Sequence, residues 1–567
     1  MASAALRAGP THEVFNQPPA LQDFNCFDSD TALGEALSRE GGEWAEGAAR
    51  DLGAIAGSRR AIEWGFQANE RPPRLRTHDR FGFRVDEVDY DPAWHELMRV
   101  AIGHGLHALP WREPGPGAHV ARAAMFSLLM QAEGGFGCPI SMTFAVIAPL
   151  RRQPELAAEW EPRFLSLDYD ERCLPAAEKR GAICGMALTE KQGGSDVRAN
   201  TTTAKPLGAD GGPGAEYEIV GHKWFCSAPM SDAFLILAQS AGGLSCFLLP
   251  RWRPDGERNG FHIQRLKDKL GNRSNASGEV EFAGAWARML GEEGRGVQTI
   301  IEMVNHTRLD CAISATSGYR AGVAQAIHHA THRSAFGRAL IAQPLMRNVL
   351  ADLCIESEAA TASTLRLARS YDEAAAGDEQ AAAFRRVATA VLKYWTAKRA
   401  PTHAAECLEC LGGNGYVEES AMPRIFRESP LASIWEGPAN VQCLDVLRAL
   451  AKAPDSLEAF VAEVELAAGA EPRLDAHMRD LRAELSRDQA TLELRARRVV
   501  EAMAIALQAS LLVRHGDEAV AEAFCASRLG GDRGQALGTL PAGVAFGRII
   551  ERSDPASADA PRQPHSP

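Results

Sequence analysis

The stretch T-E-K-Q-G-G-S-D, from Thr189 to Asp196, follows an apolar run from Ile183 to Leu188 and precedes a polar segment. An apolar run that breaks into two adjacent glycines flanked by hydroxyl side chains predicts a strand that ends in a loop which a ligand can approach closely. The hydroxyls of Thr189 and Ser195 and the loop amides supply small hydrogen-bond donors. We therefore expect this loop to receive a polar ring edge or a phosphate.

The pattern of apolar and turn-forming residues changes several times along the rest of the chain, and each change suggests a domain boundary. Hydrophobic residues make up 46% and charged residues 24% of the 567 residues, as is usual for a globular protein. Helix-spaced apolar residues lie on both sides of a region of short alternating runs and glycine-rich turns. We expect an α+β multi-domain fold with an N-terminal arm (1–40), a helical domain (41–184), a mostly antiparallel β domain (185–290), a helical bundle (291–450), a C-terminal helical extension (451–552) and a disordered tail (553–567).

Hydropathy, cysteine content and charge exclude several classes of protein. No window approaches ~18 uninterrupted apolar residues, so no membrane span is expected, and residues 1–10 have no apolar signal core, so secretion is not expected. Twelve cysteines without a framework spacing are typical of reduced thiols in the cytoplasm. The single C-x-x-C, Cys407 to Cys410, has no second pair that would complete a metal site. The net charge of −12 argues against a general nucleic-acid binder but leaves room for a local basic face.

An arginine-rich segment from Arg71 to Arg84 surrounds the dipeptide Pro72-Pro73 and has no regular period. Acidic residues follow it directly. We expect a solvated or inter-domain loop here.

Four further segments carry functional side chains: one sets an aromatic beside a hydroxyl at a strand end, and three combine a glycine with a charged or aromatic residue. They are His222 to Ser227, Arg333 to Gly337, Leu411 to Tyr416 and Ser433 to Gly437. Each has an ordinary structural interpretation when taken alone: a core aromatic for Phe225, a solvated cation for Arg333, a helix C-cap for Gly412 to Gly415, and a surface carboxylate for Glu436.

Taken together and in this order, the five segments resemble the acyl-CoA dehydrogenase family. The family patterns T-E-x-x-x-G-S-D, W-I-T, R-x-x-F-G, G-G-x-G-[YF] and [YW]-E-G align with residues 189–196, 225–227, 333–337, 412–416 and 435–437. Further segments are similar to the AidB branch, whose flavoproteins are linked to the bacterial response to DNA alkylation: Thr11 to Gln17, Pro92 to His95, Lys191 to Gly193 and Leu266 to Asn275.

The resemblance implies an acyl-CoA dehydrogenase-like fold that binds FAD between the β domain and the helical bundle. Thr189 and Ser195 would bond flavin and phosphate atoms, and Phe225 and Ser227 would flank the isoalloxazine. In a homotetramer typical of the family, Arg333 would reach the adenosine part of FAD across a subunit boundary. The implied cofactor-binding residues are Met186, Leu188, Thr189, Gly194, Ser195, Phe225, Cys226, Ser227, Arg333, Phe336, Ile434, Trp435 and Asn440.

The same resemblance makes Glu436 the general base. It would remove the α-proton of an acyl-CoA thioester while a β-hydride leaves to flavin N5 on the opposite face. Some family members carry this base before an arginine in the helix after the β domain. The matching position here is Thr307, before Arg308, so Glu436 is the one candidate.

The sequence also departs from the family pattern near the expected cofactor. Pro438-Ala439 stands where relatives carry hydroxyl residues that bond the flavin phosphate region, and proline lacks an N–H. Glu409 stands where the family has glutamine, and a carboxylate there would repel a pyrophosphate unless it is turned away or paired.

Three functional readings stay open at this point. The first is an FAD-dependent oxidoreductase acting on the CH–CH bond of an acyl-CoA. The second is a protective flavoprotein that binds double-stranded DNA and has vestigial dehydrogenase activity, because the C-terminal part of the AidB branch is tied to DNA binding. Its candidate basic face, otherwise a solvated helix surface, comprises Arg448, Arg495, Arg497 and Arg498. The third is an oligomeric scaffold with structural FAD.

Overall fold

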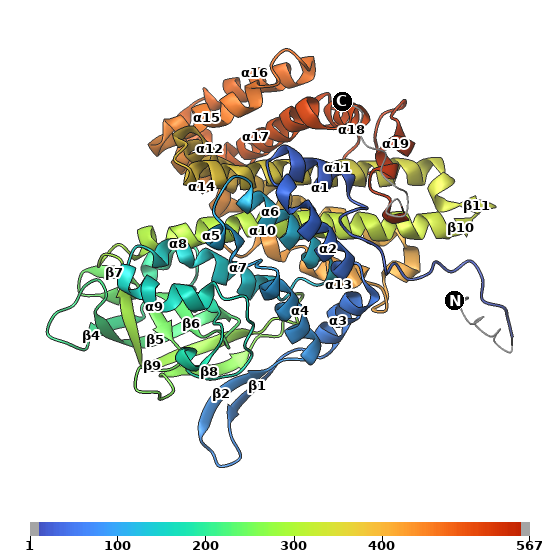
Figure 1. Cartoon of the computed structure of the whole chain (residues 1–567). Helices are drawn as coiled ribbons and strands as arrows, with labels where there is room; N and C mark the ends of the chain where they lie inside the picture. The colour runs from blue at the N-terminus through green and yellow to red at the C-terminus, as the bar shows by residue number, and fades with distance from the viewer. Residues whose placement is uncertain (1–10, 557–567) are drawn as a thin grey trace.

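The computed structural model describes residues 11–556, and its helical and β regions follow one another in the predicted order (Figure 1). The arm and the N-terminal helical domain contain α1 (Thr31–Arg39), α2 (Glu46–Ala56), α3 (Arg59–Glu70), α4 (Pro92–Gly103), α5 (Leu109–Arg112), α6 (Ala118–Ala132), α7 (Gly137–Ala145), α8 (Ile147–Leu150) and α9 (Pro154–Phe164). The helical bundle contains α10 (Gly296–His332), α11 (Pro344–Ala375), α12 (Glu379–Cys410), α13 (Met422–Glu428) and α14 (Ala439–Lys452). The extension contains α15 (Pro454–Glu465), α16 (Pro472–Leu485), α17 (Leu492–His515), α18 (Glu518–Phe524) and α19 (Phe546–Glu551).

The β domain is a mostly antiparallel sheet that closes on itself. Its seven strands are β3 (Cys184–Ala187), β4 (Thr203–Pro206), β5 (Glu216–Ser227), β6 (Ala233–Ser240), β7 (Gly243–Pro250), β8 (Phe261–Leu266) and β9 (Ser277–Leu290). The order is β3-β6-β4-β5-β9-β7, with β8 beside β9, and an additional β6–β7 pairing closes the ring. Only the β3–β6 and β4–β6 pairs are parallel.

Strand β6 is apolar on both faces because it separates two cores. Phe234 and Ile236 pack with the aromatic residues inside the closed sheet. Their neighbours Leu235 and Leu237 point the other way, into a cluster formed with α7–α9 and the start of α10. The alternation of side chains along a strand therefore joins the β domain to the helical domains on either side of it in sequence.

The arginine-rich segment that was expected to be a loop is a β-hairpin, so that prediction is wrong. Strand β1 (Arg74–His78) pairs antiparallel with β2 (Arg84–Asp89), and the hairpin projects from the body of the protein (Figure 1). Its exposure alternates along β1, which is the signature of a half-buried strand. An ion pair between Arg76 of β1 and Glu87 of β2 links the two strands, and Arg258 of the β domain also pairs with Glu87. The acidic residues after the arginines were the signal for a strand pair.

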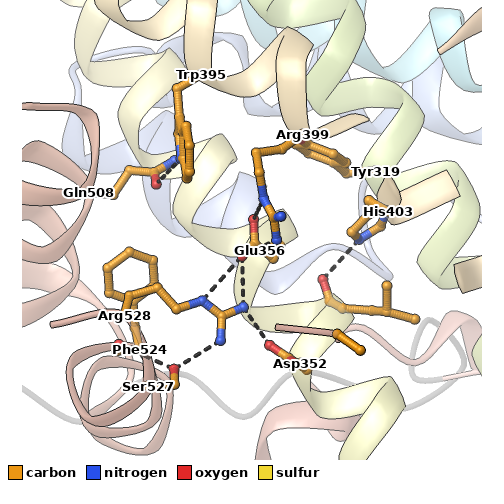
Figure 2. A network of polar contacts seen from close by, with 12 residues as sticks. Tyr319, Asp352, Glu356, Trp395, Arg399, His403, Gln508, Phe524, Ser527 and Arg528 are labelled. Carbon is orange, nitrogen blue, oxygen red and sulfur yellow. Dashed lines mark hydrogen bonds and ion pairs between the residues drawn. The ribbon is translucent and has the colours of Figure 1, made fainter. Parts of the chain in front are cut away.

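The C-terminal extension is fixed to the bundle by a buried ionic network (Figure 2). Arg528, in a π-helical turn from Cys525 to Leu529, pairs with Asp352 and lies 2.7 Å from a Glu356 oxygen. Arg399 of α12 reaches the same Glu356 at 3.2 Å. Because these ions are almost fully buried, each depends on its partner to stay charged.

The two ends of the described chain meet on the same helix core. The backbone N–H of Thr31 donates to the carbonyl of Arg552, and the Arg552 guanidinium pairs with Glu35 of α1 and Glu358 of α11. Buried Arg320 of α10 donates to the carbonyl oxygens of both Ser29 and Ser553. The first four residues predicted to be a tail, 553–556, therefore begin in contact with the core; the remainder lies outside the described residues.

Candidate active site

Glu436 lies in the connection between the short 3-10 turn Leu431–Ser433 and α14, and its backbone is held in an unusual conformation. Its φ of 58° is in the left-handed region, which a non-glycine residue adopts only when its surroundings impose it. Arg308 of α10 donates to the Glu436 carbonyl at 3.1 Å, and Gln442 donates to the same oxygen at 3.0 Å. Side chains from two helices thus fix the direction of the carboxylate.

A buried lysine completes this clamp. Lys393 of α12 donates to the carbonyl of Trp435 at 2.9 Å and to that of Gly437 at 2.5 Å. Its ammonium group has no carboxylate partner among the described residues, and burial lowers its pKa. Arg308 is itself paired with Asp445 at 2.7 Å. The sequence analysis missed Lys393, although a lone cation in the apolar run from Val391 to Trp395 was a usable signal.

The Glu436 side chain faces a small cavity of about 40 Å³ between the helical domains. The walls come from the end of α6, from α7 and from α10, and the lining residues are Phe126, Met130, Gly134, Gly137, Cys138, Ser141, Met142, Thr307, Asp310, Cys311, Ser314 and Trp435. Glu436 is therefore not the surface carboxylate that the isolated motif allowed. Most of the lining is apolar or weakly polar, so the cavity suits an extended apolar chain with one reacting centre near the carboxylate.

The environment of Glu436 shifts its protonation toward the neutral acid. Burial raises the pKa of the carboxyl, while a hydrogen bond from Thr307 and the charges of Arg308 and Lys393 act in the opposite direction. A carboxylate whose pKa is brought closer to neutrality is a stronger base than an exposed one. The arrangement fits a proton acceptor at the mouth of an apolar cavity.

The loop from Thr189 to Asp196 follows β3 as predicted and is held in place by a buried ion pair. Glu190 is fully buried and pairs with Lys223 of β5 at 2.8 Å. It also accepts hydrogen bonds from the backbone amides of Thr201 and Thr202, and although burial opposes ionisation, these donors and Lys223 hold its pKa well below the usual range. With Glu190 buried, Gly194 and Ser195 remain exposed for a ligand.

The end of β5 lies beside this loop. The amide of Trp224 donates to the Thr189 carbonyl at 2.8 Å. Phe225 is 49% exposed, so it is not a core aromatic. The Ser227 hydroxyl receives a hydrogen bond from Asn275 at 2.8 Å and lies 3.1 Å from the Cys138 sulfur, which lines the Glu436 cavity. The loop, the strand end and the cavity are therefore neighbours.

The remaining residues predicted at the cofactor differ in how they are placed. Met186 and Leu188 are half-buried against α7, and Ile434 is 61% exposed beside Glu436. The Cys226 side chain is buried inside the closed sheet, which leaves only its backbone for a ligand. Asn440, at the start of α14, accepts a hydrogen bond from Arg497. All five therefore lie on elements that border the loop or Glu436.

Two buried polar atoms in this region lack partners among the described residues and fit a bound flavin. They are Nε1 of Trp435, beside Glu436, and Oδ1 of Asn275, whose amide nitrogen bonds Ser227. A donor and an acceptor next to an exposed aromatic are what a planar heterocycle with ring nitrogens and carbonyls requires. Asn275 belongs to the segment already quoted as AidB-like, although its role was not predicted.

Arg333 and Phe336 lie far from Glu436 within one chain. Arg333 follows α10 directly, 26 residues after Thr307, which corresponds to about 39 Å along the helix axis. It begins a small hairpin, β10 (Ser334–Ala335) and β11 (Arg338–Ala339), at the end of α10 remote from the β domain (Figure 1). Phe336 is 98% exposed in a left-handed conformation.

The glycine turn from Gly412 to Gly415 lies at the same end. It forms a 3-10 turn after α12, as a helix C-terminal feature. The N-terminal arm connects the two: Asn16 accepts from Arg333 through its carbonyl, and Gln17 accepts from Asn414. Glu409 is exposed on this surface. Arg333, Phe336 and the glycine turn therefore lie together at the end of the bundle opposite to Glu436.

The four arginines suggested for DNA are not equivalent. Arg495 is 15% exposed and paired with Glu484 at 2.8 Å. Arg497 donates to the Asn440 side chain at 2.8 Å. Arg448 is 61% exposed and shares Asp445, at 3.5 Å, with two other arginines. Arg498 is exposed. Three of the four, Arg448, Arg497 and Arg498, thus remain accessible.

Comparison with known proteins connects this geometry to a family. Residues 16–171 match the adaptive response protein AidB N-terminal domain, residues 185–285 the acyl-CoA dehydrogenase middle domain, and residues 294–451 the acyl-CoA dehydrogenase C-terminal domain. The chain belongs to the acyl-CoA dehydrogenase family, in its AidB branch. It is an acyl-CoA dehydrogenase-like flavoprotein, and FAD is the cofactor of that family.

Individual members of the family match most of the chain. The chain is 49% identical over 445 residues to AidB of Escherichia coli (strain K12), which covers 78% of this chain and 81% of the relative. It is 31% identical over 421 residues to acyl-CoA dehydrogenase family member 11 of Caenorhabditis elegans, covering 71% and 66% of the two chains.

Two solved structures share the whole architecture, including the extension. The structure of C. elegans ACDH-11 in complex with C11-CoA has a TM-score of 0.83 at 27% identity and covers 93% of each chain. Bd2924 in its apo-form has a TM-score of 0.81 at 29% identity, covering 89% of this chain and 100% of the other. The predicted family and fold are therefore confirmed.

No helix among residues 11–556 is long and apolar enough to cross a membrane. The same residues hold no cluster of three or more metal-ligating side chains, and Cys407 and Cys410 are buried free thiols.

Proposed function

We propose that this protein is an FAD-dependent oxidoreductase that dehydrogenates a CH–CH bond of an acyl-CoA, with Glu436 as the general base. The placement of Glu436 at a cavity that borders the Thr189 to Asp196 loop and the end of β5 supports this proposal most directly. Thr189, Ser195, Phe225, Ser227 and their neighbours would hold the flavin.

Bound FAD would supply the hydride acceptor for the substrate β-carbon. The side chains of the protein do the rest. The carboxylate of Glu436 removes the α-proton, and the hydrogen bond from Thr307 favours the ionised form that this step needs. Lys393, Arg308 and Gln442 keep the carboxylate in place before substrate arrives, which lowers the entropic cost of the step.

The distance between the two ends of helix α10 suggests how a complete site is assembled. Arg333 and Phe336 stand about 39 Å along α10 from Thr307, too far to contact the same flavin ring system. In a homotetramer, this end of one subunit would meet the Glu436 end of another and supply the adenosine contacts. The 98% exposure of Phe336 in a single chain supports this assignment.

The test uses the purified flavoprotein without oxygen. Titration with acyl-CoAs of increasing length should bleach the flavin absorbance for at least one chain length. Glu436→Gln should still bind that acyl-CoA, as seen by a shift in the flavin spectrum, but reduce the flavin about 10²–10⁴-fold more slowly. Absence of bleaching with every chain length would reject the dehydrogenase assignment.

A second candidate function is binding of duplex DNA in the response to DNA alkylation, as the AidB resemblance implies. One observation favours it: Arg386 and Arg448, with side chains 36% and 61% exposed, share the carboxylate of Asp445 with the buried Arg308, and Arg498 lies on the neighbouring helix α17. These arginines would contact the phosphates of the duplex.

We place the protein in the cytoplasm, and the twelve free thiols support this.

A further inference from the structure

The cavity of Glu436 continues into a second and larger one. The second cavity measures about 60 Å³ and shares Met130, Gly134 and Ser314 with the first. Helix α10 forms a wall of both cavities. Thr307 and Cys311 line the first cavity, Ser314 lines both cavities, and Ala321 lines the second. From Thr307 to Ala321 the wall runs about 21 Å along the helix axis. The two cavities are therefore adjacent, and a chain that starts at Glu436 and enters the second one would follow this wall.

One part of the second cavity has an apolar wall made mostly of small side chains. This part is lined by Ile425, by Ala432 and by small residues of α10 and α12, namely Ala315, Gly318, Ala321, Ala400 and Ala404. Small side chains leave space rather than fill it, so this part admits methylene groups without offering them polar contacts.

The far part of the same cavity is polar. Gln131, at the end of α6, and Arg424 of α13 both line it. The amide nitrogen Nε2 of Gln131 and the guanidinium nitrogen Nη1 of Arg424 are buried and have no hydrogen-bond partner among the described residues. Arg424 is held in place through Nη2, which donates to the Ala132 carbonyl at 2.8 Å. Because leaving a buried donor unsatisfied is unfavourable, two such donors beside one cavity point to an acceptor that occupies it.

The charges around these donors select the kind of acceptor. Glu133 and Glu428 also line the cavity. Glu133 is fully engaged, with Ser274 and Asn69 donating at 2.7 and 3.0 Å and the amides of Gly135 and Phe136 donating to its second oxygen. Burial and the neighbouring Glu133 raise the pKa of Glu428.

These carboxylates already balance the positive charge of Arg424. A second anion from a ligand would meet two carboxylates and one guanidinium, an unfavourable combination in a desolvated space. A neutral oxygen avoids this repulsion and still accepts from both free donors.

We propose that the two cavities form one acyl channel whose far end selects chains bearing a neutral oxygen, a hydroxyl or a carbonyl, that accepts hydrogen bonds from Gln131 Nε2 and Arg424 Nη1. This inference rests on the proposed function for the nature of the ligand, an acyl-CoA. It adds the substrate class: long acyl chains oxygenated near the end distant from the thioester.

The test compares acyl-CoAs of equal length that differ only at the terminal carbon. Binding to the holoprotein is measured by calorimetry, and flavin bleaching is recorded separately. For short chains that cannot reach Gln131, the saturated and ω-hydroxy compounds should bind equally. Above a threshold length, the ω-hydroxy compound should bind at least about tenfold more tightly, and more tightly than the ω-carboxy compound.

The variant Gln131→Leu should remove most of this preference, so that saturated and ω-hydroxy chains above the threshold length bind about equally. Gln298→Leu, an exposed glutamine at the start of α10, is the matched control and should keep the preference. Should Gln131→Leu fold poorly, the length series on the wild-type protein still decides the question.

Equal binding of saturated and ω-hydroxy chains at every length would overturn the proposal, and so would a stronger preference for the ω-carboxy compound. If no acyl-CoA bleaches the flavin but long ω-hydroxy chains still bind preferentially, the dehydrogenase assignment fails and the channel assignment stands. The two proposals are therefore separable.

Discussion

The ammonium group of Lys393 lies 2.9 Å from the carbonyl oxygen of Trp435, the residue that precedes Glu436, and 2.5 Å from that of Gly437, the residue that follows it. The lysine bridges the two peptide units around a residue whose φ is 58°. Such a conformation persists because surrounding groups over-determine it. Lys393 is thus a positioning residue for Glu436.

Replacement of this lysine tests that role. Lys393→Met keeps the length of the side chain and removes the donor, so the Glu436 carboxylate should lose its fixed direction. We expect kcat to fall by up to about 10²-fold, the cost of an ångström-scale misplacement, with a smaller change in KM. Lys393→Arg should recover part of the loss. Equal losses in the methionine and arginine variants, accompanied by unfolding, would indicate a purely structural role.

The pH dependence of flavin reduction should report on Glu436. Burial raises the pKa of this carboxyl, and only the ionised form can accept a proton, so kcat/KM should rise with pH through that pKa and then level off. Thr307→Val removes a hydrogen bond that favours the charged form. The rising limb should therefore move to higher pH. Thr331→Val, on the same helix but near its far end, should leave the limb in place.

The buried network around Arg528 should dominate the attachment of the extension (Figure 2). Arg528→Met leaves Asp352 and Glu356 buried without their main partner, which should reduce the free energy of unfolding by roughly 3–5 kcal/mol. Arg548→Met breaks an exposed pair with Asp517 on the same extension and should cost no more than about 1 kcal/mol. Urea unfolding of both variants measures the difference.

The same network gives a pH signature. Burial pushes the pKa of Glu356 up, but the Arg528 and Arg399 guanidiniums outweigh it and bring the pKa down to about 2 from 4.5. A lowered pKa in the folded state contributes stability above the unfolded pKa that disappears as pH falls through the folded one. The wild-type protein should lose this contribution between about pH 4.5 and pH 2, whereas Glu356→Gln should show no such loss in that window.

The far end of α10 should matter for cofactor binding despite its distance from Glu436. Phe336→Ala should weaken FAD binding and lower the oligomer's stability, because the residue would act in a neighbouring subunit's site. Phe81→Ala, another exposed phenylalanine at the tip of the β1–β2 hairpin, is the control. FAD affinity by fluorescence and mass by light scattering provide the measurements. Unchanged affinity in Phe336→Ala would remove the support for a shared site.

DNA binding can be tested with the arginines that differ in accessibility. If duplex DNA contacts this face, Arg448→Gln and Arg498→Gln should each reduce the slope of log K against log salt by about 0.9. Arg495→Gln should change the slope little, because Arg495 is engaged by Glu484. A slope that responds to Arg495 but not to Arg448 and Arg498 would locate the contact elsewhere.

Much of the fold and of the site followed from sequence because short motifs dictate local backbone. The Thr189 to Asp196 loop follows a strand, and short strands fill the region that their alternating pattern predicted. The family resemblance supplied the role of Glu436, and the structure added its cavity.

The unpredicted contacts are those between residues distant in sequence. Lys393 is separated from Trp435 by a glycine turn and α13, and Glu190 from its partner Lys223 by two strands. Local periodicity carries no information on such pairs. The β1–β2 hairpin was missed for another reason: alternating arginines obscured a strand period that is normally read from apolar residues.

The arrangement at the chain ends has a consequence for biosynthesis. Helix α1 is held by Arg552, and the carbonyls of Ser29 and Ser553 share one buried arginine, Arg320. During translation the first helix is made long before its partners near position 552 leave the ribosome. Until then, the contacts between the first and last helices cannot form. Proteins that bind nascent chains would therefore meet α1 without these partners.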